Sequence, residues 1–303
     1  MFFVLTTGRS GSKSLASFLS TSQRLLCLHE PEPVLLLESR RFLYGTCSRE
    51  EIVAILKKTR RPLLDGKEYG ESNQCLSFLV PALLEAFPGC KFVWLARDGR
   101  NVVSSLHSLG WYDERYRHKS VWTENLLEAD RAGQMAAREW AALGPFEKCC
   151  WYWQFTNSTI RRHLEGLEPG RWMILRLEEI GERAGELCSF LGAGDTAGGF
   201  PWTNIKKESM RLCRYAGWSQ EQRHMFEQIC REEMDFLYPG WQYQEPPGED
   251  LGATWRRKLL GLFPEDDSPP MRLAARLAGW LGVKRPLRSL YRKVLGKLAN
   301  RNE

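Results

Sequence analysis

The chain lacks the cysteine patterns that hold metals or build a disulfide framework. Its nine cysteines include no Cys-x-x-Cys pair and no zinc-type spacing, and most fall in apolar stretches. This pattern predicts buried thiols in a reducing compartment, and the odd count argues against a complete set of disulfides. Since no strong metal-ligand constellation occurs elsewhere in the sequence, we expect no bound metal.

Long hydrophobic segments are also missing. The chain begins at once with the pattern of a core strand, so we expect neither a signal peptide nor an N-terminal membrane anchor. The apolar stretches near the C-terminus are too short and too charged to span a bilayer. These absences predict a cytoplasmic protein.

The start of the chain has the pattern of a phosphate-binding loop but lacks the glycines of the ATP-binding P-loop. An apolar run over residues 1–5 opens into the Gly/Ser-rich segment 8–14 before a helical pattern begins. Backbone N–H groups at such a junction face an anion together with the positive end of the helix dipole. The P-loop needs Gly-x-x-x-x-Gly-Lys-Ser/Thr, and Thr7 and Ser12 stand where its two glycines belong. The structural alternative is a turn that binds no ligand.

The segment Arg9-Ser10-Gly11-Ser12 resembles the Arg-Ser-Gly-Thr loop of the sulfotransferase superfamily. The resemblance extends over residues 1–243, the expected catalytic domain. It implies a bacterial-type enzyme that binds 3′-phosphoadenosine 5′-phosphosulfate (PAPS) and passes its sulfuryl group to a hydroxyl group without a metal. The residues of this loop that it places on the cofactor are Arg9, Ser10, Gly11, Ser12, Lys13 and Ser14.

A second loop has the spacing of that family's other phosphate-binding pair. Residues 91–105 have the pattern of a strand, a polar turn and the start of a helix. In the sulfotransferase pattern, an Arg at the strand end and a Ser eight positions later bind the 3′-phosphate, and Arg97 and Ser105 have that separation. A guanidinium group binds phosphate through charge-assisted hydrogen bonds, and a hydroxyl adds a donor without repulsion. The alternative is that Arg97 is an ordinary solvated residue, which the order of the two loops disfavours.

A carboxylate between the two loops is the candidate catalytic base. The attacking hydroxyl must lose its proton as the new S–O bond forms, and a Glu or His within reach can accept it. The resemblance favours Glu30 over His29, because His-Glu-Pro is similar to the Glu-Pro segment of carbohydrate and tyrosyl-protein sulfotransferases. His29 stays a candidate, and a surface loop stiffened by Pro31 and Pro33 is the structural alternative.

Cations on the first loop are expected to act on the leaving group. Arg9 aligns with the family's loop cation, and as a catalytic residue it would stabilise charge on the bridging oxygen as the bond to sulfur breaks. Lys13 departs from the Thr that is common at its position, and it either contacts the 5′-phosphate or faces solvent. Relatives close a basic loop over the 3′-phosphate; its Arg-Lys-Gly triplet is absent here, and Lys206 is the candidate in its place.

The order of these patterns predicts a three-layer α/β fold with a mostly parallel central sheet. Strand and helix patterns alternate, and 303 residues with 43% hydrophobic content suffice for a full core. We expect further strands over 61–67 and 172–180, and helices over 76–87 and 218–237. Both phosphate loops then lie at the carboxyl ends of neighbouring strands, as in the P-loop-like fold of sulfotransferases.

Residues 251–303, a predicted C-terminal extension, carry all the excess positive charge. They hold twelve Lys and Arg but four Asp and Glu, a net charge of +8, and basic and apolar residues alternate at helical spacing. Basic amphipathic helices are typical of membrane-surface elements, so we predict peripheral binding to an anionic membrane. A helical appendage packed on the catalytic domain fits equally well, and a nucleic-acid-binding tail fits less well.

The acceptor follows only indirectly from the sequence. The resemblance favours a hydroxyl of a carbohydrate, a glycolipid or another metabolite. Aromatic residues in 111–153 are either a binding platform for it or ordinary core residues, and we favour core packing for Trp140, Trp151 and Trp153. Two rival functions remain: a P-loop nucleotide or metabolite kinase, and a non-catalytic module that docks membranes or partners.

Overall fold

The central strand of the fold is the apolar run at the start of the chain. The computed structural model describes residues 1–61, 63–64, 66–194 and 215–246, and within them every residue of this first strand is buried. The strands are β1 (Phe2–Thr6), β2 (Leu25–His29), β3 (Leu63–Leu64), β4 (Lys67–Ser72), β5 (Lys91–Ala96) and β6 (Trp172–Arg176). They form one sheet in the order β2-β4-β1-β5-β6, with these five strands parallel and β3 antiparallel to β4.

Helices fill the connections between these strands. The α-helices are α1 (Ser12–Leu19), α2 (Leu36–Leu43), α3 (Arg49–Thr59), α4 (Val80–Ala86), α5 (Gly99–Ser108), α6 (Val121–Glu124), α7 (Ala137–Ala142), α8 (Pro145–Leu164), α9 (Ile180–Leu191) and α10 (Gln220–Leu237). The 3₁₀ turns are η1 (Gln74–Phe78), η2 (Glu114–Lys119), η3 (Leu177–Glu179), η5 (Tyr215–Gly217) and η6 (Trp241–Tyr243).

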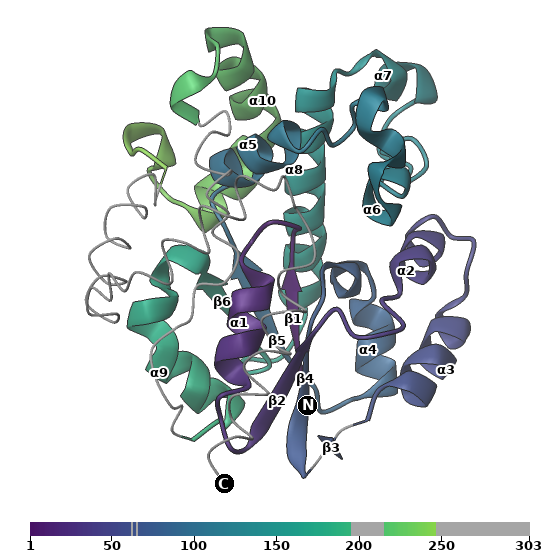
Figure 1. The fold of residues 1–303 in the computed structure, drawn as a ribbon, viewed down its shortest axis with the longest axis vertical. Helices are drawn as coiled ribbons and strands as arrows, with labels where there is room; N and C mark the ends of the chain where they lie inside the picture. The colour runs from purple at the N-terminus through teal and green to yellow at the C-terminus, as the bar shows by residue number, and fades with distance from the viewer. Residues whose placement is uncertain (62, 65, 195–214, 247–303) are drawn as a thin grey trace, which may run out of the picture. The chain divides into compact units, whose positions relative to one another are not determined.

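Alternating side chains of β1 face two separate hydrophobic cores. Phe2 and Val4 pack with residues of α1 and α9 on one face of the sheet. Phe3 and Leu5 pack on the other face with residues of α3, α4, α5, α8 and α10. Because successive strand residues point to opposite faces, a strand buried on both sides must be apolar throughout. The predicted three-layer α/β fold is therefore confirmed, with helices on both faces of the sheet (Figure 1).

The carboxyl ends of the five parallel strands meet at one edge of the sheet. The aligned pairs near this edge are His29 with Ser72, Thr6 with Leu95, and Ala96 with Arg176. From β1 the chain continues to β2, which lies on one side of β1 in the sheet, whereas from β5 it continues to β6, which lies on the opposite side. Connections that diverge in this way leave a crevice between the two strands, which is where open α/β sheets bind ligands. The β1 and β5 loops, both predicted to bind phosphate, border this position.

Some predicted elements have other bounds in the structure. The strand expected over 61–67 is only the two-residue β3, and the chain then enters β4, an inner strand of the sheet. The helix expected over 76–87 is divided into η1 and α4, whereas the helix expected over 218–237 is α10, which begins after the capping box of Ser219. The favoured core packing of the tryptophans is confirmed, since Trp140, Trp151 and Trp153 are buried.

The chain divides into two compact units, Met1–Pro247 and Gly248–Glu303. The second unit lies outside the described residues. The predicted tail 251–303 therefore has no structural description. In the part of the chain that is described, no helix combines the length and apolar character needed to cross a membrane. All eight cysteines in the same part are buried, and burial raises the pKa of thiols such as Cys149 and Cys150.

Candidate active site

The first loop, residues 7–11, leaves β1 in a conformation that depends on glycine. Gly11 has φ +79°, and a Cβ atom added to it would lie 2.5 Å from Leu177 Cδ1. Arg9 has φ +69°, which non-glycine residues adopt rarely. The hydroxyls of Thr7 and Ser10, both buried, lie 2.7 Å apart and fix the turn. Since Gly11 has no side chain to cap α1, an anion can approach the N–H groups of the first helical turn.

The second loop meets the first one directly. The Arg97 guanidinium donates from Nη1 to the carbonyl oxygen of Arg9 over 2.6 Å. The Arg9 guanidinium in turn donates from Nε to Ser105 Oγ over 3.0 Å. Ser105 is 7% exposed on α5, and Arg97 is half-buried at the end of β5. The structure thus brings together three residues that the sequence predicted to bind phosphate.

The electrostatics of this pair of arginines favour an anion. Loss of hydration lowers the pKa of Arg9, and the positive charge of Arg97 lowers it further. Burial also lowers the pKa of Arg97, partly offset by the negative charge of Glu178. Among the residues the structure describes, no carboxylate forms an ion pair with either guanidinium group. Two neighbouring cations of this kind are stabilised when a phosphate or sulfate group binds between them.

Two features that hold Arg97 were not predicted from the sequence. The indole Nε1 of Trp153, in α8, donates to the carbonyl oxygen of Arg97 over 3.2 Å. The next residue, Asp98, is buried, caps α5 and forms an ion pair with Arg100 at 2.7 Å. Its place before Gly-Arg at the start of a helix is a capping pattern that could have indicated this role. The pairing of Trp153 with the loop has no local sequence signal.

Glu30 and His29 lie at the carboxyl end of β2, on the same edge of the sheet. Glu30 has φ +48°, and its backbone N–H donates to the carbonyl oxygen of Ser72 over 3.1 Å. Burial raises the pKa of Glu30, while the nearby Gln74 side chain and the charge of Lys13 lower it in part. Burial lowers the pKa of His29, whose Nε2 lies 3.9 Å from Glu30 Oε2. A carboxylate with a raised pKa is suited to accept a proton.

Two side chains connect Glu30 with the first loop. The backbone N–H of Gly8 donates to Tyr152 Oη, and that hydroxyl donates to Gln74 Oε1, each over 3.0 Å. Gln74 also lies close enough to Glu30 to lower the pKa of its carboxyl group. The positive charge of exposed Lys13 lowers the pKa of both Glu30 and His29. The candidate base and the candidate phosphate loop therefore belong to one site.

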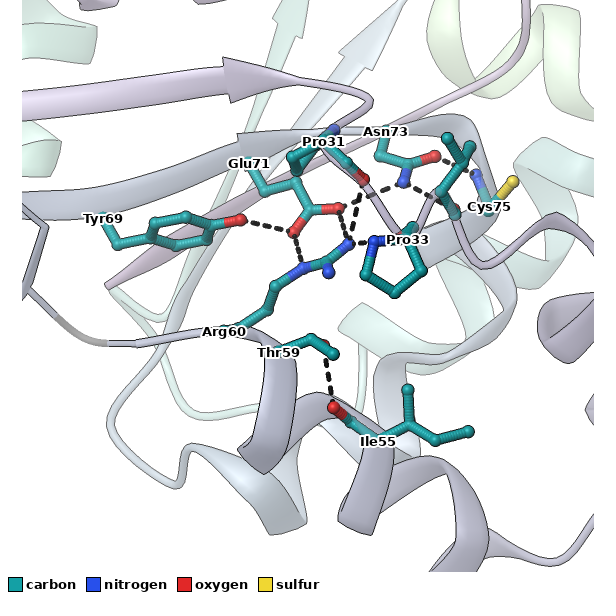
Figure 2. A network of polar contacts seen from close by, with 10 residues as sticks. Pro31, Pro33, Ile55, Thr59, Arg60, Tyr69, Glu71, Asn73 and Cys75 are labelled. Atoms are coloured by element: carbon teal, nitrogen blue, oxygen red, sulfur yellow. Dashed lines mark hydrogen bonds and ion pairs between the residues drawn. The ribbon is translucent and has the colours of Figure 1, made fainter.

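A buried ion pair beneath the site holds the loop that follows Glu30 (Figure 2). The Arg60 guanidinium donates to both carboxylate oxygens of Glu71, over 2.6 and 2.9 Å, and to the carbonyl oxygen of Pro33 over 2.8 Å. Tyr69 Oη and Asn73 Nδ2 also donate to Glu71, over 2.8 and 3.1 Å. Both charged side chains are at most 1% exposed. This network fixes the backbone on the C-terminal side of Glu30.

The remaining predicted residues lie in different surroundings. Ser14 is buried within α1, and the carbonyl oxygen of Ser12 accepts a hydrogen bond from Ser72 Oγ over 3.2 Å. Lys206 lies outside the described residues, so its predicted contact with the 3′-phosphate has no structural description. Within the described ranges, no group of three or more His, Cys, Asp and Glu side chains could hold a metal ion.

No protein-family model matches this chain, and no curated protein matches it. Three similar solved structures are all sulfotransferases or sulfotransferase domains. The sulfotransferase from Alicyclobacillus acidocaldarius has 14% identity and a TM-score of 0.45, and the match covers 78% of this chain and 95% of that one. The sulfotransferase domain from the curacin biosynthetic pathway has 15% identity and a TM-score of 0.41, and the match covers 94% of this chain and 98% of that one. The sulfotransferase domain from the Synechococcus PCC 7002 olefin synthase has 13% identity and a TM-score of 0.42, and the match covers 94% of this chain and 95% of that one. Similarity this low assigns no function, which depends on the residues of the site.

Proposed function

We propose that this protein is a sulfotransferase that moves the sulfuryl group of PAPS to a hydroxyl group of an acceptor. The observation that supports it most is the meeting of Arg9, Arg97 and Ser105 at the crevice between β1 and β5. Two arginines and a hydroxyl match a phosphate group, and the N-terminus of α1 lies next to them for a second anionic group. A donor with phosphates at its 3′ and 5′ positions has the two anionic groups that this arrangement fits.

Glu30 is the proposed general base of the transfer. Its carboxylate accepts the proton of the acceptor hydroxyl while that oxygen forms a bond to sulfur. The bond between sulfur and the bridging oxygen breaks at the same time, and its electron pair stays on the 5′-phosphate. The products are the sulfate ester of the acceptor and adenosine 3′,5′-bisphosphate, so atoms and charge balance.

The cations of the first loop are proposed to stabilise the leaving phosphate. Negative charge grows on the bridging oxygen. Lys13, whose charge reaches Glu30, and the N–H groups at the start of α1 would stabilise that charge. The sequence predicted that Arg9 both binds the cofactor and acts on the leaving group, and the contact of its Nε atom with Ser105 adds a place beside the proposed 3′-phosphate site. We therefore assign Arg9 to both phosphates, as a binding and a catalytic residue.

A titration that compares two nucleotides tests this proposal. Calorimetry with adenosine 3′,5′-bisphosphate and with ATP and Mg²⁺ should show a strong preference for the bisphosphate, because only this ligand has the 3′-phosphate for Arg97 and Ser105. A preference for ATP and Mg²⁺ would identify a kinase instead. Failure to bind either nucleotide would contradict the proposal and leave a docking module.

A further inference from the structure

A half-buried carboxylate, Glu178, lies beside the candidate site and has no role in the proposed mechanism. It belongs to η3, which directly follows β6, and Ala96 at the end of β5 is aligned with Arg176 at the end of β6. The loops after these two strands therefore start side by side. The neighbouring Leu177 reaches the first loop as well, because a Cβ atom added to Gly11 would lie 2.5 Å from its Cδ1 atom. The turn η3 thus borders both loops that are proposed to hold the nucleotide.

Glu178 acts electrostatically on Arg97, the residue proposed to bind the 3′-phosphate. Burial lowers the pKa of Arg97, and the negative charge of Glu178 is the largest of the effects that oppose this change. Burial likewise raises the pKa of Glu178, and the positive charge of Arg97 is among the effects that lower it again. Without a bound anion, the two opposite charges therefore stabilise each other.

The hydroxyl of Tyr238 fixes the position of this carboxylate. Tyr238 is 8% exposed, follows the last residue of α10, and donates from Oη to Glu178 Oε2 over 3.0 Å. This hydrogen bond uses one carboxylate oxygen, so a proton on the other oxygen leaves the contact intact. The charges on either side of Glu178 in the chain neutralise each other, since Arg176 forms an ion pair with Glu179 over 2.7 Å while it lies over the ring of Tyr238.

Asp98, the other carboxylate near Arg97, already has a partner. The charged and titratable groups that act on Glu178 from other elements are Arg97, Asp98 and Tyr238. Asp98 is buried at the start of α5 and forms an ion pair with Arg100 over 2.7 Å. Its charge is therefore compensated whether or not an anion binds. Glu178 is then the carboxylate whose charge responds to a ligand at Arg97.

We propose that Glu178 takes up a proton from the solvent when the 3′-phosphate of the nucleotide binds at Arg97, with Tyr238 holding the carboxyl group in place. The phosphate takes over the charge of Arg97 and leaves the carboxylate half-buried beside a second anion, which disfavours its charged form. A proton on Oε1 of Glu178 removes the repulsion, and no other bond changes. This inference rests on the proposed function and makes nucleotide binding dependent on pH.

Calorimetry in buffers of different ionisation enthalpy counts the protons that accompany binding. Adenosine 3′,5′-bisphosphate is titrated into the full chain and into Glu178→Gln over a range of pH. The amide of the variant takes up no proton, and protons lost by the phosphates of the nucleotide cancel in the comparison. We expect the unmodified chain to take up more protons than Glu178→Gln, by up to about one per nucleotide. Equal uptake by the two chains would overturn the proposal.

The affinity for the bisphosphate should change with pH accordingly. Above the pKa of Glu178 in the free protein, each proton taken up on binding lowers the affinity by up to about tenfold per pH unit relative to Glu178→Gln. The control Glu182→Gln removes an exposed carboxylate in the first turn of α9 and should follow the unmodified chain. A purely structural role of Glu178 would instead lower the affinity of Glu178→Gln equally at every pH, which would contradict the proposal.

A second pair of variants keeps the test independent of whether Glu178→Gln folds. Tyr238→Phe keeps the ring but removes the hydrogen bond that lowers the pKa of Glu178, so the fall in affinity should begin at a higher pH. Tyr243→Phe, at a 92% exposed position in η6, should leave the pH profile unchanged. Identical profiles of these two variants would remove Tyr238 from the proposal.

The same titrations separate this inference from the proposed function. Normal binding of the bisphosphate without proton uptake by Glu178 rejects only the inference. Failure of the unmodified chain to bind the bisphosphate rejects the proposed function itself.

Discussion

At the scale of single residues, the site is defined by three charged groups, of which Arg97 and Glu30 are half-buried and Arg9 is exposed. Arg9 and Arg97 keep their guanidinium groups close together, and burial lowers the pKa of both. Burial raises the pKa of Glu30, because loss of hydration disfavours the charged form of an acid just as it does for a base. Each of these groups is less stable in its charged form than it would be in water. In the proposed mechanism, a bound anion would stabilise the two arginines, and a proton taken from the acceptor would neutralise Glu30.

Replacing Arg97 should weaken nucleotide binding. Arg97→Met removes a charged hydrogen-bond donor, which contributes about 1.5–3 kcal/mol, or roughly ten- to a hundredfold in affinity for adenosine 3′,5′-bisphosphate. Calorimetric titration measures the loss. Arg49→Met is the matched control, because Arg49 is exposed at the start of α3. This variant should bind the nucleotide as tightly as the unmodified chain does. An unchanged affinity in Arg97→Met would remove the second loop from the site.

Replacing Glu30 should stop the chemistry while nucleotide binding continues. Glu30→Gln keeps the shape of the side chain but cannot accept a proton, so the transfer rate should fall roughly 10²–10⁴-fold. The control is Glu32→Gln on the same loop, whose side chain is exposed. If His29→Ala loses the activity and Glu30→Gln retains it, the base is His29.

The pH dependence of the transfer follows from the raised pKa of Glu30. Only the deprotonated carboxylate accepts a proton, so activity should be present above this pKa and lost as the pH falls through it. Because burial raises the pKa, the loss should begin at a higher pH than for an exposed glutamate. A pH profile of the rate measures this acidic limb, which should be absent from the residual activity of Glu30→Gln.

At the scale of the elements, the buried pair of Arg60 and Glu71 joins the end of α3 to β4 and to the loop after Glu30. Glu71 lies on an inner strand, so its charge is stable only because Arg60, Tyr69 and Asn73 donate to it. Arg60 also reaches the carbonyl oxygen of Pro33. The pair therefore has two separable roles, one in stability and one in positioning the loop.

Removing one partner of this pair should destabilise the fold. Glu71→Gln leaves the charge of Arg60 buried without compensation, which costs about 3–5 kcal/mol. Tyr69→Phe is the control, since it removes one hydrogen bond to the same carboxylate and should cost about 0.5–1.5 kcal/mol. Urea unfolding measures both values, and equal losses would show that the buried charge is not the dominant feature.

A double replacement separates positioning from stability. Arg60→Met with Glu71→Met removes both charges and should recover most of the stability lost in Glu71→Gln. The carbonyl oxygen of Pro33 still loses its donor, so the transfer rate should stay low although nucleotide binding is normal. Full recovery of the rate would assign the pair to stability alone.

At the scale of the whole molecule, we predict that residues 251–303 bind an anionic membrane. If residues 251–303 bind an anionic membrane, their deletion should leave a protein that binds nucleotide but no longer sediments with anionic vesicles. Each basic residue near such a surface contributes about 1 kcal/mol, and salt should weaken the association because it screens exposed charge. Unfolding of the shortened chain, with no vesicle binding by the intact one, would indicate a packed appendage.

The sequence by itself determined the layers and the local chemistry of this protein. The sequence predicted β1, β5 and the loops after them correctly. Apolar strand patterns, turn residues and helix starts are set by residues close together in the chain, so they can be recognised from the sequence. The inner strand β4 was not predicted, because its sequence Lys67–Ser72 is polar and its carboxylate is acceptable only beside Arg60. Polar residues in an inner strand oppose the pattern that strand prediction uses.

Only the tertiary structure decided how the separate segments meet. The contact of Arg9 with Ser105 and the hydrogen bonds from Gly8 through Tyr152 to Gln74 join residues far apart in the chain. Sequence spacing carries no information about such contacts without a known relative. They form because five parallel strands end at one edge of the sheet, which brings the loops of distant segments to the same place.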